Sequence, residues 1–168
     1  MYLLTQHDAE RLFLPIRTHE DIHFGISYTK VKEAGPLRQI AKGPAKVAEA
    51  PTEADWEQAA VYRITLPLLP PSLREGSGVG LGQGGGSLLS IDYQGDCARL
   101  YANGKLIADH FQYGRPFLYG LWRLPKDCNE LELRIMPLQA NAPIYLPREA
   151  DATPGEAVKS ITVTNEGL

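Results

Sequence analysis

Aromatic side chains crowd one short segment of the chain, between residues 113 and 122. Arg115 lies among its four rings. Flat rings stack on the apolar face of a sugar, while guanidinium and carboxylate groups hydrogen-bond its hydroxyls, so such mixed surfaces suit a ligand pocket. The segment, with the acidic residue shortly before it, predicts a carbohydrate site made of Trp122, Tyr119, Tyr113, Arg115 and Asp109. The competing interpretation is that these rings form core and inter-domain contacts.

A second segment, His19-Glu20-Asp21-Ile22-His23, spells the H-E-x-x-H pattern of zinc proteases. That pattern binds zinc only on a helix, which directs both imidazoles at one metal ion. Apolar and polar residues alternate from Ile22 to Tyr28, which is typical of a strand, where four residues span about 13 Å. The sequence therefore predicts no metal site and no metalloprotease activity. A structural calcium ion is compatible with the composition, but no motif argues for one, and we expect no cofactor.

Two further motifs are better explained by the backbone than by chemistry. Residues 80–85 spell G-x-G-x-x-G, yet a dinucleotide site needs a helix after the glycines, and an alternating strand follows them here. Asp92 and Asp96 are close to Asp109 in the sequence, and two carboxylates about 5 Å apart would serve a retaining glycosidase. Asp96, however, follows Gly95 at a turn, where aspartate bonds its own backbone. Asp92 lies on the polar face of a strand, so we expect structural roles for both and no catalytic residue.

The elements that must position these residues are short strands. Runs with strand character span 22–28, 61–66, 89–94, 97–102, 105–111, 131–136 and 158–164, and 113–123 is a loop that leads into another strand. Asn103-Gly104 predicts a type I′ hairpin, because that turn needs positive φ at both central residues. Proline steps make 31–50 a loop, and Thr52 caps a helical turn that ends near Ala60. About eight strands with at most one or two short helical turns predict an all-β, antiparallel sandwich or jelly roll.

Composition bounds the remaining alternatives. The 168 residues carry a net charge of −3, which gives no reason to expect nucleic acid or an anionic membrane as a partner. The sequence contains no run of about 18 apolar residues, the length that could span a bilayer. The length suits one domain over 1–168, in which 1–55 supply edge strands or a linker from a preceding domain. Strand positions rarely meet the geometry of a disulfide, so we expect Cys97 and Cys128 to be unpaired, with a disulfide in an oxidising compartment as the alternative.

The segment from Leu89 to Asp109, with Phe111 and Gly114-Arg115-Pro116-Phe117 after it, resembles the C-terminal β-sandwich modules of bacterial family 35 glycoside hydrolases, the β-galactosidases. In those modules a strand ends in Tyr-x-Gly-Asp, and a hairpin, an aspartate and an aromatic-Gly-Pro loop follow. The resemblance covers about residues 60–135 and implies a galactose-binding-domain-like jelly roll. Phe117 stands where the family has tryptophan, and the glycine-rich segment 76–86 is longer than the family's.

The resemblance also implies a function. It implies a non-catalytic accessory module that binds carbohydrate (a galactoside or a plant polysaccharide), docks on the catalytic domain of a parent enzyme, or does both. The family's catalytic glutamates lie in a barrel of about 250 residues, too long for a chain of 168 residues, so we do not expect this chain alone to be an enzyme. The parent would be secreted or periplasmic. The alternatives are a purely structural inter-domain module and a stand-alone hydrolase.

Overall fold

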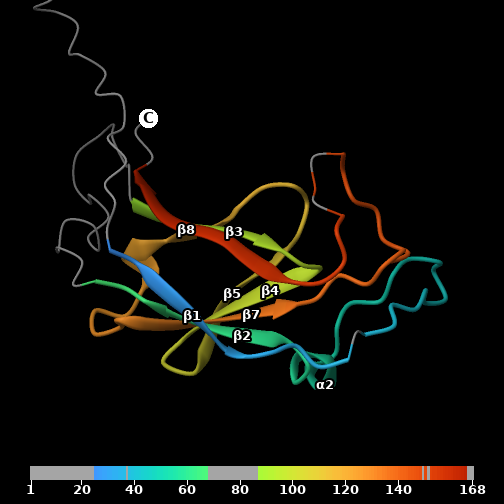
Figure 1. Cartoon of the computed structure of the whole chain (residues 1–168), viewed down its shortest axis with the longest axis horizontal. Helices are drawn as coiled ribbons and strands as arrows, with labels where there is room; N and C mark the ends of the chain where they lie inside the picture. Colours follow the sequence, from blue (N-terminus) through green and yellow to red (C-terminus); the bar gives the residue numbers. More distant parts are fainter. Residues whose placement is uncertain (1–24, 37, 68–86, 149, 151, 166–168) are drawn as a thin grey trace, which may run out of the picture.

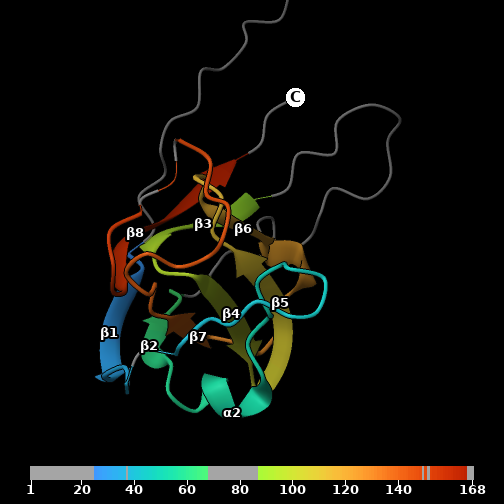
Figure 2. The ribbon, with the colours of Figure 1, turned by 90° about the vertical axis from the view of Figure 1, so that its right-hand side faces the viewer.

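The computed structural model describes residues 25–36, 38–67, 87–148, 150 and 152–165, which fold as two antiparallel sheets lying face to face (Figure 1 and Figure 2). One sheet has the order β1 (Ser27–Lys32), β2 (Ala60–Thr65), β7 (Glu130–Met136), β4 (Cys97–Ala102) and β5 (Lys105–Phe111). The other has the order β6 (Phe117–Gly120), β3 (Ser87–Gln94) and β8 (Ala157–Asn165). The predicted all-β antiparallel sandwich is therefore confirmed.

Alternation along the strands decides which side chains face the core. Ile64 on β2, Leu100 on β4 and Leu133 on β7 are fully buried, and the residues that alternate with them are more exposed. Leu89 and Ile91 face them from β3 of the other sheet, and all five belong to one apolar cluster. Each such side chain stabilises the fold by about 1.5–3 kcal/mol when it is fully buried. A slip of one residue would expose the whole set, so this burial fixes the register.

A short helix covers the outer face of the five-stranded sheet. Helix α2 (Glu53–Trp56) begins at Thr52, which forms a reciprocal capping box with Asp55. The helix ends at Trp56 rather than near residue 60, and this ring joins a second apolar cluster on that face of the sheet. Within the described ranges, no helix is long and apolar enough to cross a membrane.

The two cysteines lie in different apolar clusters. Cys97 belongs to the cluster under α2, whereas Cys128 belongs to the core between the sheets. Both are buried, and within the described residues neither forms a disulfide. The sandwich places their side chains in separate layers, which does not favour a disulfide between them.

The hairpin between β4 and β5 turns as its sequence predicts. Asn103 and Gly104 have φ angles of 50° and 73°. Positive φ at both central residues is the signature of the type I′ turn, whose twist matches that of the flanking strands. The turn sets the register as far as the Tyr101–Leu106 pair, and a shift of one residue then carries β5 to its end at Phe111, beside the site described below.

Two segments differ from the sequence-based expectation. β1 occupies residues 27–32 rather than 22–28, so it extends into the segment expected to be a loop, and residues 22–24 lie outside the described part. Most side chains of this edge strand are exposed, so the alternation of apolar residues does not mark it. The aromatic segment 113–123 contains the expected strand itself, β6, followed by a 3-10 turn, η1 (Leu121–Arg123).

A buried carboxylate joins the two sheets along one edge of the sandwich. Glu156, just before β8, accepts hydrogen bonds from Lys30 Nζ on β1 at 2.8 Å and from Tyr62 Oη on β2 at 2.6 Å. Figure 2 shows β1 and β8 on the same side of the molecule. The Glu156 carboxylate raises the pKa of Lys30, while burial and then the same carboxylate raise the pKa of Tyr62 to about 12. The side chain of Glu156 is 7% exposed, so water can replace these two donors only poorly.

Replacing Glu156 by Gln should lower the free energy of unfolding by about 1–3 kcal/mol, because the partly buried Lys30 would lose its buried counter-charge and keep only the exposed Glu33. Glu130→Gln is the matched control, since Glu130 pairs with Arg63 at the exposed surface, where ion pairs contribute about 0–1 kcal/mol. Urea unfolding at neutral pH measures both changes. Equal losses in the two variants would show that Glu156 does not join the sheets as described.

Candidate functional site

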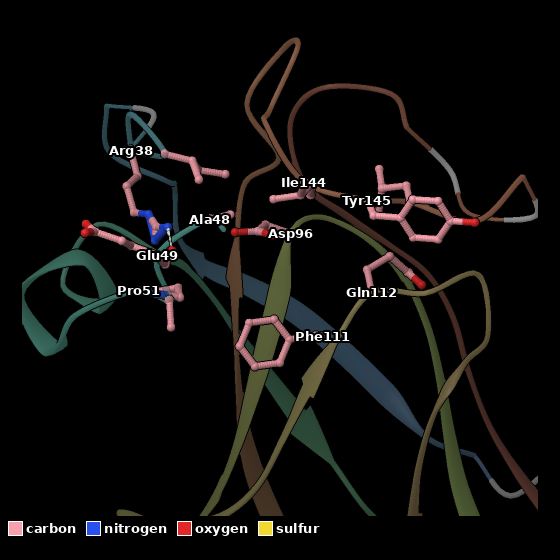
Figure 3. Close-up of a pocket in the computed structure, with 12 residues that line it drawn as sticks. Arg38, Ala48, Glu49, Pro51, Asp96, Phe111, Gln112, Ile144 and Tyr145 are labelled. Carbon is pink, nitrogen blue, oxygen red and sulfur yellow. Dashed lines mark hydrogen bonds between the residues drawn. The ribbon is translucent and has the colours of Figure 1, made fainter. Parts of the chain in front are cut away.

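A pocket of about 430 Å³ lies at one end of the sandwich, where the turn between β3 and β4 meets the end of β5 (Figure 3). Two long connections complete it. The one between β1 and β2 contributes Arg38 and Glu49, and the one between β7 and β8 contributes Tyr145. Asp96 and Phe111 line the pocket from the sandwich itself. Segments far apart in the sequence therefore converge on the Asp96 turn.

The backbone fixes the position of Asp96. Gly95 has a φ of 154°, and a Cβ atom there would lie 2.6 Å from Ile135 Cγ2 and 2.9 Å from the Met136 oxygen, so only glycine fits. The Asp96 amide donates to the Met136 carbonyl at 2.8 Å, and the Asp96 carbonyl accepts from the Gln112 amide at 3.0 Å. The turn is therefore locked to both β7 and the end of β5. The Asp96 side chain therefore starts from a fixed backbone position at the pocket.

Asp96 is a largely buried residue, 8% exposed, whose carboxylate oxygens stay open to the pocket. Its hydrogen bonds within the described part of the chain are those of its main chain. Figure 3 shows the carboxylate directed into the pocket, on the side of the connection that carries Arg38. Burial raises the pKa of Asp96, and the positive charge of Arg38 opposes that shift. Burial keeps this carboxylate from full hydration, so the group favours a ligand that brings donors to it.

Some residues that line the pocket with Asp96 are held by their own hydrogen bonds, and others are open to a ligand. The Gln112 amide group donates to the Tyr93 carbonyl at 2.7 Å and accepts from the Gly114 amide at 2.8 Å, which occupies it in holding the loop. The Arg38 guanidinium donates to the Glu49 carbonyl. Phe111 is 54% exposed and contributes an open ring to the pocket lining (Figure 3). The pocket thus combines a carboxylate acceptor, a cationic donor and an aromatic face.

The residues that the sequence predicts as a sugar site do not line this pocket. Tyr119 lies on β6 and is 6% exposed in the core between the sheets, so its ring has no free face. Asp109 is exposed on β5, opposite Arg99 in the register. Tyr113 and Arg115 are exposed in the connection from β5 to β6. The Trp122 ring lies over the Gly120 backbone, where a Cβ atom would be 2.6 Å from it.

Sequence reasoning missed the pocket because its parts are distant in the sequence. It assigned Asp96 to a turn on local grounds, and the turn exists, but the burial of its carboxylate depends on the two long connections. No motif marks Arg38 or Tyr145, because each lies in a segment whose sequence predicts only a loop. Phe111 stood within the recognised segment but looked like an ordinary strand residue. The signal that could have found the site is the glycine-aspartate pair at the end of a buried strand.

Metal chemistry receives no support from the described residues. Among them, no group of three or more His, Cys, Asp or Glu side chains could hold a metal ion. His19, His23 and the glycine motif at 80–85 lie outside the described part, so the expectations for them stay predictions.

Asp96→Asn should stabilise the protein at neutral pH. The folded state holds a proton on Asp96 more tightly than the unfolded chain does, so the contribution of this group to stability is complete only below about pH 4 and is lost as pH rises through the raised pKa. Removing the charge should raise the free energy of unfolding at pH 7 by about 1 kcal/mol, and the gain should shrink towards pH 4. Chemical unfolding at several pH values measures it. Asp109→Asn, at an exposed position, is the control; a destabilised Asp96→Asn would contradict the description of the carboxylate as unpaired.

Comparison with known proteins identifies no family. No protein-family model matches the chain, and neither a curated protein nor a solved structure matches it significantly. The resemblance to the β-galactosidase modules therefore stays a prediction from the sequence. Function has to be argued from the geometry of the Asp96 pocket.

Proposed function

We propose that this chain is a non-catalytic accessory module that binds carbohydrate, a galactoside or a plant polysaccharide, in the Asp96 pocket. The observation that carries the proposal is the carboxylate of the largely buried Asp96, which is directed into the pocket and open to it, without a donor from the described residues. Sugar hydroxyls are neutral donors, and one carboxylate can accept from two of them at once. Hydrogen bonds to a charged group contribute about 1.5–3 kcal/mol each.

The surroundings of Asp96 suit the rest of a sugar ring. The half-exposed Phe111 ring can stack on the apolar face of a pyranose, and Arg38 can donate to further hydroxyls. Tyr145, 91% exposed, stands at the rim, where Figure 3 shows its ring extending away from Asp96. A polyol suits both charged groups, because its hydroxyls can donate to Asp96 and accept from Arg38.

Binding is favoured over hydrolysis by the direction of the second carboxylate. Glu49 also lines the pocket, but Figure 3 shows its side chain turned away from Asp96. A glycosidase needs two carboxyl groups that flank one bond from opposite sides. The proposal of an accessory module of a glycoside hydrolase rests further on the sequence resemblance, which supplies the class of parent enzyme.

Docking on a partner domain is a second candidate role. Leu118 and Trp122 are both substantially exposed. Residues 118 and 120 share the outer face of the three-stranded sheet by alternation, and the Trp122 ring lies over Gly120. The two side chains therefore form a small apolar patch on that face, which a catalytic domain could cover.

Calorimetric titration with galactose, simple galactosides and soluble plant polysaccharides tests the sugar site. We expect the wild-type protein to bind at least one of them with a dissociation constant of about a millimolar or below. Asp96→Asn should weaken binding at least about tenfold, because an amide oxygen accepts more weakly than a carboxylate. Asp109→Asn is the matched control, since it removes the same charge from an exposed position outside the pocket.

Three outcomes are informative. Loss of binding in Asp96→Asn with normal binding in Asp109→Asn supports the pocket. Loss of binding in Trp122→Ala with normal binding in Asp96→Asn would move the site to the aromatic segment predicted from the sequence. An absence of binding to every sugar at millimolar concentration would contradict the proposal and leave the docking role.

A further inference from the structure

The edge of the sandwich opposite the Glu156 contact is closed by a histidine. β5 ends the five-stranded sheet and β6 ends the three-stranded sheet, and residues 112–116 connect them. His110 on β5 stacks on the Phe117 ring of β6, with ring centroids 5.0 Å apart and planes 9° apart. Its ring also lies edge-on to Tyr93 of β3 at 5.7 Å and tilted towards Tyr113 at 5.2 Å. One imidazole therefore contacts both sheets and the loop between them.

The hydrogen bonds of this imidazole suit a neutral ring. The Tyr93 hydroxyl lies 2.9 Å from His110 Nδ1 and 3.1 Å from the His110 carbonyl oxygen. When Nδ1 carries the proton, the imidazole donates to the hydroxyl, and the hydroxyl donates to the carbonyl. Nε2 is buried and has no partner among the described residues. A protonated ring would bear a second N–H at this buried position, with no acceptor for it from those residues.

The charges around His110 do not compensate for its protonation. Tyr93 and Tyr113 are neutral phenols at acidic pH, and Phe117 offers only a ring face. Asp109, the neighbour on β5, favours the protonated form, but burial outweighs it and lowers the pKa of His110. Asp96 lies beyond Tyr93, and its own burial raises its pKa. The closed cluster thus admits the neutral imidazole and opposes the imidazolium.

We propose that His110 is a proton-operated latch, which holds the β5–β6 edge closed when neutral and releases the 112–116 connection when protonated. Protonation would be accompanied by movement of the ring towards water, which breaks the stack on Phe117 and the contact with Tyr113. The Tyr93 hydroxyl would lose its imidazole partner in the same step. Tyr93 and Phe117 are the core residues that contact this ring in the described structure, and we expect the rest of the core between the sheets to remain.

The latch would also act on the pocket. Phe111 and Gln112, which line the pocket, follow His110 directly. The Gln112 amide group binds the carbonyl of Tyr93, whose hydroxyl contacts His110. Opening of the edge would therefore loosen the wall beside Asp96 and weaken ligand binding at acidic pH. This consequence rests on the proposed function, whereas the latch itself does not.

Amide hydrogen exchange of the full chain from about pH 7.5 to pH 5 tests the latch, with rates corrected for their intrinsic pH dependence. In the wild-type protein, protection of the amides in 110–118 should fall by up to about tenfold per pH unit as the pH drops below about 6.5, the ordinary value that the released imidazole regains, and should level off below the lowered pKa of the closed state. Protection in β2 and β7 should stay constant as the internal control. His110→Gln keeps a polar side chain that does not titrate, so it should remove the pH dependence.

The latch is wrong if wild-type protection in 110–118 is independent of pH, or if His110→Gln retains the dependence. Asp96→Asn tests whether Asp96, rather than His110, causes the pH dependence of protection. The latch predicts that this pH dependence persists in the variant. If His110→Gln does not fold, titration of the wild-type imidazole by NMR decides, because a pKa at or above the ordinary value of about 6.5 would overturn the proposal. Failure of sugar binding at every pH would count against the proposed function alone, since the exchange experiment contains no sugar.

Discussion

The burial of two apolar sheet faces against each other is the interaction on which the rest of the structure depends. Leu89 and Ile91 from the three-stranded sheet meet the inward side chains of the five-stranded sheet, and this contact fixes the register of both. Because the sheets differ in width, their edges need side chains to close them. Glu156 joins them at the β1–β8 edge, and His110 does so at the β5–β6 edge. Both edge contacts use ionisable groups, one charged and one neutral.

The same framework places a costly group at the end of the sandwich. Gly95 and the hydrogen bonds of the turn hold the Asp96 backbone between β7 and the end of β5. The two long connections then surround its carboxylate, which stays open to the pocket without a donor from the described residues. Functional sites commonly retain interactions that oppose stability. The charge of Asp96 opposes folding in the same way, and the proposed ligand would offset that cost.

Sequence reasoning succeeded where local rules decide the structure. The Asn103-Gly104 turn, the capping box of Thr52 and the alternation from Leu89 to Tyr93 each follow from backbone geometry or periodicity. It misplaced β1, because an edge strand with exposed side chains has no apolar period to detect. It also grouped Tyr119 with Trp122, although one ring is in the core and the other lies over Gly120. The Asp96 pocket needs long-range contacts, which no local pattern encodes.

The pKa of the Asp96 carboxyl group, followed by NMR with and without a saturating galactoside, tests the central claim most directly. Hydroxyl donors from a bound sugar stabilise the ionised carboxylate, so the account predicts that the ligand lowers this pKa towards or below the ordinary aspartate value. The free protein should show the raised value that burial produces. A pKa that the sugar leaves unchanged, while binding is detected by another signal, would contradict the assignment of Asp96 as the group that receives the ligand.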